Sequence, residues 1–160
     1  KIFYNGASIL DLGAAPGSWS QYISKNYKNI KLASIDLNKF EEVKNSYQII
    51  GDFTLDIYKK KILNFFLGKI DIVVSDMAVN TTGNKNLDSI QTSELCLDAM
   101  RFSKTILKKN GIFVSKIFIG STFNEIINES KKIFKKNKVF KPEASRKDSK
   151  ESFIVCSLLY

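Results

Sequence analysis

Short apolar runs alternate along the chain with longer amphipathic stretches, and this alternation limits the possible folds more than any other feature. The runs are rich in Ile, Val and Phe, and several are continuous, which is typical of strands buried on both faces of a parallel sheet. Strands are predicted at 7–12, 30–37, 47–52, 70–76, 111–118, 138–141 and 152–159, and helices at 17–27, 54–67, 88–109 and 122–136. The pattern predicts an α/β fold, a doubly wound sheet with helices on both faces.

The end of the chain departs from this alternation. Its last two predicted strands, 138–141 and 152–159, have no full helix between them, so the last strand is predicted to be antiparallel to its neighbours. Asp88 and Thr122 have the spacing of helix N-caps, and Asn110-Gly111 is a predicted helix end. The 160 residues fit a single domain over 1–160. No apolar run approaches the roughly 20 residues of a membrane span, so no membrane contact is expected.

The chain has no histidine and only two cysteines, Cys96 and Cys156, which lie far apart. Catalysis by Ser-His or Cys-His pairs and metal binding by histidine are therefore excluded, and no metal site is expected. Lysine, aspartate, glutamate and tyrosine remain for proton transfer. Both cysteines are predicted to be buried, small apolar residues in a reducing compartment.

The formal net charge is +9, and much of the excess lies in one segment near the end of the chain. Against the acids Glu143 and Asp148, this segment carries nine bases: Lys131, Lys132, Lys135, Lys136, Lys138, Lys141, Arg146, Lys147 and Lys150. Such a segment indicates a polyanionic partner such as RNA or DNA. The alternative is a solvated helix end whose lysines complement the helix dipole.

A glycine-containing turn follows the first predicted strand in LDLGAAPGSWSQY, at 10–22. It is neither the G-x-G-x-x-G of dinucleotide-binding proteins nor a phosphate-binding loop ending in Gly-Lys-Ser/Thr. Pro16 lacks an amide donor and Trp19 adds bulk, so the turn suits a small uncharged or zwitterionic group better than a pyrophosphate. A nicotinamide-dependent oxidoreductase is therefore disfavoured.

Carboxylates end four of the predicted strands, at Asp11, Asp36, Asp52 and Asp76. Ligands of open parallel sheets bind at these strand ends. Asp36 can accept hydrogen bonds from both ribose hydroxyls of an adenosine, and Asp52 lies where its adenine is expected. Such carboxylates repel a pyrophosphate and suit the sulfonium and ammonium groups of S-adenosylmethionine. Singly, each of them could instead be an ordinary turn or N-cap residue.

Five stretches in order along the chain resemble the FtsJ (RrmJ) family of ribose 2'-O-methyltransferases. They are LDLGAAPGSWSQY, Gly51-Asp52-Phe53, SDMAVNTTGN at 75–84, FVSKIFIG at 113–120 and KPEASRKDSKESFIVC at 141–156. The resemblance implies the Rossmann-like S-adenosylmethionine-dependent methyltransferase fold, with seven mostly parallel strands and an antiparallel last strand. It implies a cofactor site that comprises Gly13, Gly17, Ser18, Trp19, Asp36, Asp52, Phe53 and Asp76.

The resemblance also implies a catalytic Lys-Asp-Lys-Glu group, whose last three members match Asp76, Lys116 and Glu151. Its first lysine belongs to a segment well upstream of the glycine turn, so that role is not assigned to Lys1 and the segment is expected to be missing here. Val79 stands where the family commonly has proline. Lys116 is predicted either to orient or to deprotonate the ribose hydroxyl, since a nearby sulfonium lowers the pKa of a lysine and carboxylates raise it.

The expected substrate is a ribose 2'-hydroxyl, in a uridine of large-subunit (23S-type) ribosomal RNA. Two alternatives remain open: a transfer RNA ribose methyltransferase, and a non-catalytic RNA-binding module of ribosome assembly. The basic segment is predicted to follow the RNA backbone beside the site. The protein is expected to act as a monomer in the cytoplasm or an organelle.

Overall fold

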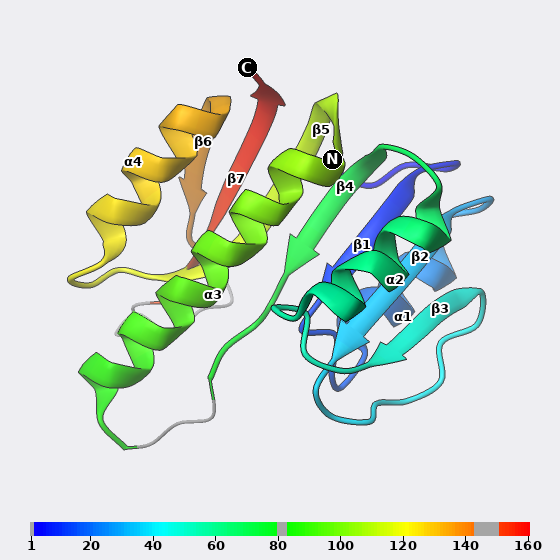
Figure 1. Cartoon of the computed structure of the whole chain (residues 1–160), viewed down its shortest axis with the longest axis horizontal. Coiled ribbons are helices and arrows are strands. Elements are labelled where there is room, and N and C mark those ends of the chain that lie inside the picture. The colour runs from blue at the N-terminus through cyan, green and yellow to red at the C-terminus, as the bar shows by residue number, and fades with distance from the viewer. Residues whose placement is uncertain (1, 80–82, 143–150) are drawn as a thin grey trace.

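The computed structural model describes residues 2–79, 83–142 and 151–160, and it is built around one seven-stranded sheet (Figure 1). The strands are β1 (Ser8–Leu12), β2 (Lys31–Asp36), β3 (Ser46–Ile50), β4 (Ile70–Ser75), β5 (Leu107–Phe118), β6 (Phe134–Phe140) and β7 (Glu151–Leu159). The helices are α1 (Ser18–Asn26), α2 (Asp56–Phe66), α3 (Lys85–Ile106) and α4 (Phe123–Ile133). Lys1 and the bases Arg146, Lys147 and Lys150 lie outside the described residues.

The strand order is β3-β2-β1-β4-β5-β7-β6. Neighbours from β3 to β5 are parallel, whereas β7 is antiparallel to both β5 and β6. The predicted doubly wound sheet with an antiparallel last strand is therefore confirmed. The first residue of β7 lies at the same edge of the sheet as the last residues of the parallel strands.

Helices cover the two faces of the sheet unequally. In Figure 1, α2, α3 and α4 lie in front of the sheet and α1 lies behind it. The larger core, which includes Met100, Phe113 and Phe134, forms on the side of α2, α3 and α4. A smaller core forms on the side of α1, where Ile23 packs with strand residues such as Ile9. None of the helices in the described ranges has the length and apolar character needed to cross a membrane.

Both predicted boundaries of α3 were wrong, and so was the predicted capping by Thr122. α3 begins after Asn84, whose side chain accepts hydrogen bonds from the backbone N–H of Asn86 (3.2 Å) and Leu87 (3.3 Å), so Asp88 is a first-turn residue rather than the cap. The same helix ends at Ile106, and Asn110-Gly111 belongs to β5. α4 follows Thr122 as predicted, but the Thr122 hydroxyl bonds Ser93 Oγ at 2.6 Å and caps no backbone donor.

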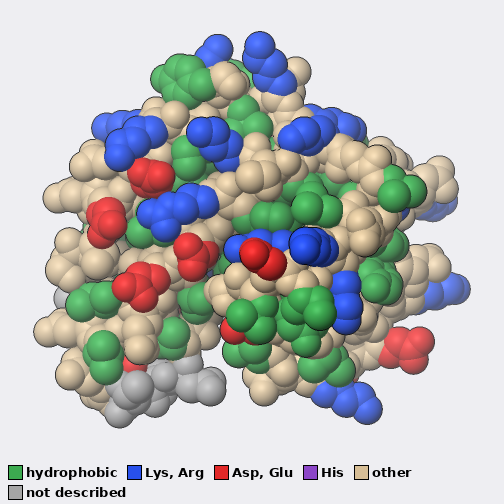
Figure 2. Space-filling view, viewed as in Figure 1, with side chains coloured by type: hydrophobic (Ala, Val, Ile, Leu, Met, Phe, Trp, Pro, Cys, Tyr) green, Lys and Arg blue, Asp and Glu red, His purple; other side chains and the backbone are tan. Residues whose placement is uncertain are grey.

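β6 begins at Phe134, earlier than the predicted 138. Its lysines suggested a helix end, but on the outermost strand of a sheet they can point into solvent while Phe134 packs inward. Lys131 and Lys132 end α4 at the edge of the sheet opposite the carboxyl ends of the parallel strands (Figure 1). Lysine and arginine side chains also gather along the upper part of the face in Figure 2, toward that edge.

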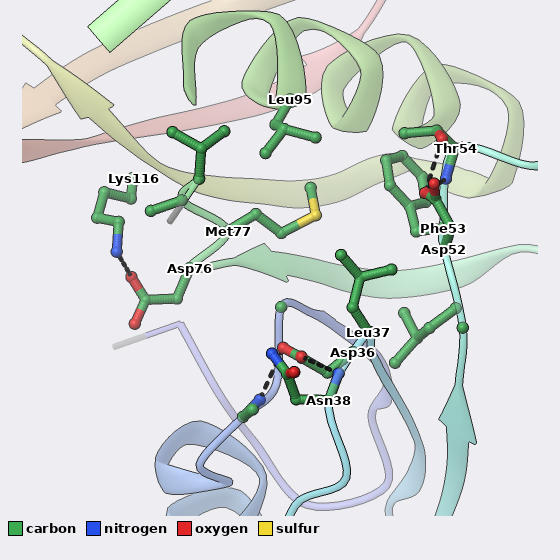
Figure 3. Close-up of a pocket in the computed structure, with 16 residues that line it drawn as sticks. Asp36, Leu37, Asn38, Asp52, Phe53, Thr54, Asp76, Met77, Leu95 and Lys116 are labelled. Atoms are coloured by element: carbon green, nitrogen blue, oxygen red, sulfur yellow. Dashed lines mark hydrogen bonds and ion pairs between the residues drawn. The ribbon is translucent and has the colours of Figure 1, made fainter. Parts of the chain in front are cut away.

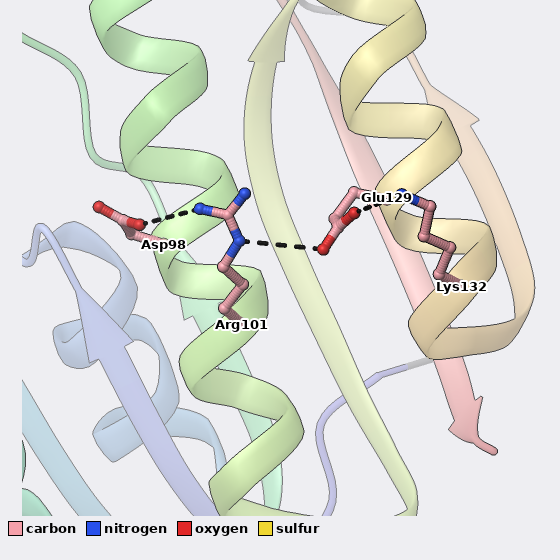
Figure 4. Close-up of polar contacts among 4 residues, drawn as sticks. All are labelled: Asp98, Arg101, Glu129 and Lys132. Atoms are coloured by element: carbon pink, nitrogen blue, oxygen red, sulfur yellow. Dashed lines mark hydrogen bonds and ion pairs between the residues drawn. The ribbon is translucent and has the colours of Figure 1, made fainter.

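Ion pairs join α3 to α4 on the surface (Figure 4). Arg101 contacts Asp98 of its own helix at 3.4 Å and Glu129 of α4 at 3.8 Å, and Glu129 also contacts Lys132 at 3.2 Å. The Arg101 side chain is about half exposed, so water and salt screen these contacts.

We expect Glu129→Gln to lower the free energy of unfolding by only about 0.5 kcal/mol, because exposed ion pairs contribute little. Urea denaturation in low salt and in 1 M salt measures this effect. The difference from the unsubstituted protein is expected to disappear in 1 M salt, and a loss that persists there would show that Glu129 acts through packing instead.

Candidate active site

A pocket of about 700 Å³ opens at the carboxyl ends of the parallel strands (Figure 3). Its walls come from the residues after β1, β2, β3 and β4, from Lys116 of β5, and from Leu95 of α3. Open parallel sheets bind their ligands in this position. It is therefore the candidate active site.

The turn after β1 forms the floor of the pocket and is closely packed. The N–H groups of Gly13 and Ala14 both donate to Ile35 O, at 2.9 and 3.1 Å, and Asp76 N–H donates to Leu12 O at 3.0 Å. A Cβ on Gly13 would lie 2.6 to 2.9 Å from Met77 atoms, and the Gly13 φ of +75° is one that side chains disfavour. Only glycine fits at this crossing of two chain segments.

Asp36 and Asp52 line the pocket on neighbouring strand ends, as predicted. One oxygen of Asp36 accepts the Ala15 N–H (3.0 Å) and the other accepts the Asn38 N–H (2.8 Å), so the carboxylate is fixed in orientation. Asp52 Oδ1 accepts from the N–H (2.9 Å) and the hydroxyl (2.7 Å) of Thr54. Each carboxylate retains lone pairs that can accept from a ligand.

Lys116 lies between two carboxylates at the mouth of the pocket (Figure 3 shows Lys116 with Asp76). Its Nζ is 2.7 Å from Asp76 Oδ1 and 3.4 Å from Glu151 Oε1, and only 12% of its side chain is exposed. The three residues come from the end of β4, from β5 and from the start of β7. The predicted catalytic residues are thus in direct contact.

Asp11, the fourth strand-end carboxylate, does not line the pocket. It is fully buried and accepts a hydrogen bond from Ser20 Oγ at 2.5 Å, while its Oδ1 finds no partner within the described part of the chain. Burial raises the pKa of Asp11 to about 6; the Ser20 hydrogen bond opposes the shift, and the charges of Asp76 and Asp36 add to it. Of the four strand-end carboxylates, Asp11 is therefore the one that does not face the pocket.

The raised pKa of Asp11 predicts a pH dependence of stability. The folded protein holds this proton with a pKa of about 6, against an ordinary value of 3.8, so unfolding releases a proton between these values. The free energy of unfolding should fall as the pH rises from about 4 to 6, and the Asp11 carboxyl should account for up to about 3 kcal/mol of the fall. Chemical denaturation across this range should show a smaller decrease for Asp11→Asn. Equal slopes would contradict the assignment.

The charge of the pocket suits a cationic cofactor with an apolar ring. Three carboxylates, Asp36, Asp52 and Asp76, line the pocket. Clustered negative charge attracts a cation, and S-adenosylmethionine carries a sulfonium and an ammonium group. Leu37, 67% exposed, and the buried Phe53 line another part and can contact an adenine. The residues therefore fit this cofactor.

Three predicted cofactor residues lie outside the pocket wall, at the start of α1. Gly17 precedes the helix with a φ of +114°, and Ser18 is exposed. Trp19 packs against Phe3 and Phe153, with ring centroids 6.2 and 5.9 Å apart. Their part in cofactor binding stays a prediction.

Other lining residues were not singled out from the sequence. Met77 follows Asp76 in the SDMAVNTTGN stretch, whereas Leu95 lies on α3, where the sequence gives no local signal. Val79, which replaces the proline common in the resembling family, donates its N–H to Thr92 Oγ1 at 3.4 Å. Proline could not make this link between the loop and α3.

Comparison with known proteins agrees with this geometry. The model of the FtsJ-like methyltransferase family matches residues 1–158. Ribosomal RNA large subunit methyltransferase E of Pelagibacter ubique is 60% identical over 159 residues, 99% of this chain and 78% of that protein. The crystal structure of a Plasmodium falciparum protein assigned as a ribosomal RNA methyltransferase superposes with a TM-score of 0.83 at 31% identity, over 97% of this chain and 87% of that one.

A more distant structure has the same fold. Human methyltransferase-like protein 13, solved with S-adenosylhomocysteine, superposes with a TM-score of 0.71 at 14% identity, over 95% of this chain and 72% of that one. The family model covers residues 1–158, and the Pelagibacter relative covers 99% of the chain. The chain therefore belongs to the FtsJ-like methyltransferase family and is an S-adenosylmethionine-dependent methyltransferase.

Proposed function

We propose that this protein transfers a methyl group from S-adenosylmethionine to a ribose 2'-hydroxyl, in a uridine of large-subunit ribosomal RNA. The observation that carries the proposal is Lys116, held between Asp76 and Glu151 at the mouth of the acidic pocket. The names of the relatives support the RNA substrate, since the Pelagibacter protein is a ribosomal RNA large subunit methyltransferase.

The residues of the site divide into two groups: those proposed to bind the cofactor and those proposed to act on the ribose hydroxyl. Asp36 is proposed to accept from the two ribose hydroxyls of the cofactor, and Asp52, beside Phe53, to accept from the adenine amino group; both line the pocket. Gly13 allows the chain to approach the methionine part, and Gly17, Ser18 and Trp19 are proposed to complete the turn. Asp76 belongs to both groups, since it lines the pocket and pairs with Lys116.

The cofactor supplies a methyl group made electrophilic by the sulfonium to which it is bonded. Lys116 Nζ lies within ion-pair distance of Asp76 and Glu151, and we propose that it also contacts the ribose oxygen. Such a contact would hold the ribose oxygen in one position, which would lower the entropic part of the barrier. A neutral Lys116, with its lone pair toward the hydroxyl, would take up the proton that the hydroxyl loses on methylation, whereas a Lys116 ammonium would only orient the oxygen and the proton would leave to water.

Asp36→Asn is expected to weaken the binding of S-adenosylhomocysteine by about 10- to 100-fold, because a carboxylate accepts from hydroxyls more strongly than a neutral amide. The asparagine amide must also face either Ala15 N–H or Asn38 N–H with its own donors. Isothermal titration measures the Kd. Asp98→Asn on α3 is the matched control, and an unchanged Kd for Asp36→Asn would remove Asp36 from the cofactor site.

Labelled methyl transfer tests the proposed function. Full-length protein is incubated with labelled S-adenosylmethionine and either unmethylated large ribosomal subunits or unmethylated transfer RNA. Methylation of a 2'-hydroxyl is recognised because the adjacent phosphodiester becomes resistant to alkali. Resistant labelled dinucleotides from the large subunit would support the proposal, and label only in transfer RNA would move the substrate to that class. Binding of cofactor without transfer to either RNA would favour a non-catalytic assembly module.

We further propose that the protein acts as a monomer, with residues 1–160 forming one domain, where ribosomes are assembled in the cytoplasm. All seven strands form one sheet, so the described residues share a single fold. Sedimentation of the full-length protein measures the oligomeric state.

A further inference from the structure

Among the described residues, no helix covers β6 and β7 on one face of the sheet. On the face of α1, side chains of β7 at alternate positions are only half-buried, whereas those on the opposite face, such as Ile154 and Cys156, are buried. Along β6 the same face carries the exposed residues Lys136, Lys138 and Phe140. Within the described ranges, α1 is the only helix on this side, and it packs behind β1 and β2 (Figure 1).

The register of the sheet places an aromatic pair beside the reaction centre. Lys116 of β5 pairs with Phe153 of β7, and Phe153 pairs in turn with Phe140 of β6. Directly paired residues of antiparallel strands project from the same face. Lys116, Phe153 and Phe140 therefore form one row across three adjacent strands. The ring centroid of Trp19 lies 5.9 Å from that of Phe153.

Among the described residues, Phe140 belongs to neither apolar core. Its side chain is 49% exposed, and the neighbouring residue Val139 packs toward the core on the opposite face. A large exposed aromatic side chain beside a reaction centre is suited to contact a flat ligand. Lys136 and Lys138 precede it on the same strand and face, so positive charge accompanies the aromatic surface.

We propose that Phe140 and Phe153 form a stacking surface for a nucleotide base of single-stranded RNA next to the methylated ribose, with Lys138 beside the phosphate backbone. The inference rests on the proposed function, because the ribose that meets Lys116 fixes where its neighbours lie. Exposed aromatic side chains on sheets stack bases without sequence preference, and flanking lysines bind phosphates. The row begins at Lys116, where the RNA ribose is proposed to bind. This favours RNA over a second copy of this chain as the occupant.

The test measures RNA binding and methyl transfer separately. Full-length protein saturated with S-adenosylhomocysteine is titrated into a fluorescein-labelled single-stranded oligouridylate. Phe140→Ala is expected to raise the Kd about 5- to 100-fold, the range found for loss of one stacked base. Phe140→Leu should lose nearly as much, because it restores apolar volume without a flat face, whereas Phe140→Tyr should bind as the unsubstituted protein does.

Two controls show whether the effect belongs to this surface. Tyr47→Ala removes another aromatic side chain, 41% exposed, from the far edge of the sheet and should leave the RNA Kd unchanged. Lys138→Ala should reduce the slope of log Kd against log salt concentration by about 0.7, the value for one phosphate contact on a single strand. All variants should bind S-adenosylhomocysteine normally.

The outcomes separate this inference from the proposed function. If the unsubstituted protein methylates large subunits but Phe140→Ala binds RNA normally, the stacking surface is wrong and the function stands. If Phe140→Ala changes the oligomeric state without changing the RNA Kd, the occupant is a second copy of this chain; if it only lowers thermal stability, Phe140 is a packing residue and the stacking surface is wrong. If the unsubstituted protein neither binds nor methylates RNA, both proposals fail.

Discussion

Lys116→Ala is expected to lower kcat for methyl transfer by about 10²- to 10⁴-fold, the usual contribution of a positioned proton-transfer or orienting group. The substitution removes the cation that lies 2.7 Å from Asp76 and 3.4 Å from Glu151. The cation that Asp76 and Glu151 share is lost, and with it the proposed contact to the ribose oxygen. Single-turnover transfer of labelled methyl to unmethylated large subunits measures the rate.

The control for this prediction is Lys104→Ala, which removes an exposed lysine from the last turn of α3. It should transfer methyl groups at the rate of the unsubstituted protein. Binding of S-adenosylhomocysteine by Lys116→Ala should stay within a few-fold of normal, because Asp36 and Asp52 are unchanged. A variant that folds, binds the cofactor and still methylates at the normal rate would exclude Lys116 from the reaction.

The pH dependence of kcat distinguishes the two roles of Lys116. A lysine that accepts the hydroxyl proton must first lose its own, so the rate should rise with pH until the lysine is neutral. A lysine that only orients the hydroxyl as an ammonium should give a rate that falls when it is deprotonated. The residual activity of Lys116→Ala should lack this rise or fall of the rate with pH.

Gly13→Ala is expected to lower the free energy of unfolding by about 4 kcal/mol, through overpacking and through a disfavoured backbone conformation. The new methyl group would lie 2.6 Å from Met77 Cγ and 2.8 Å from Met77 N, at a φ of +75°. Backbone cannot move away as a flexible side chain can, since Asp76 N–H is bonded to Leu12 O. Urea denaturation measures the loss, and cofactor binding should weaken with it.

Substitutions at two other glycines distinguish the effect of overpacking from the effect of the backbone conformation. Gly6 has a φ of +81° but open space around it, so Gly6→Ala should cost about 1 kcal/mol from the backbone alone. Gly68 has open space and a φ outside that region, so Gly68→Ala should change stability little. If Gly13→Ala were no worse than Gly6→Ala, the contact with Met77 would not explain the glycine.

The local pattern of the sequence was enough to predict the helices and strands and part of the pocket wall. Continuous apolar runs identified the strands because a parallel sheet buries both faces, and the parallel neighbours then had to bring Asp36, Asp52 and Asp76 to one edge. Boundaries were less certain: the lysines of β6 resembled a helix end because an edge strand can be as polar as a helix.

By itself the sequence determined the doubly wound sheet, the glycine turn and, through five ordered motifs, the family and its candidate residues. Only the tertiary structure brought Glu151 to Lys116, because β7 runs antiparallel and its first residue therefore lies at the carboxyl edge of the parallel strands. It also buried Asp11 beneath α1 and turned Leu95 into the pocket. These placements depend on packing between elements distant in the chain, which no local spacing of residues encodes.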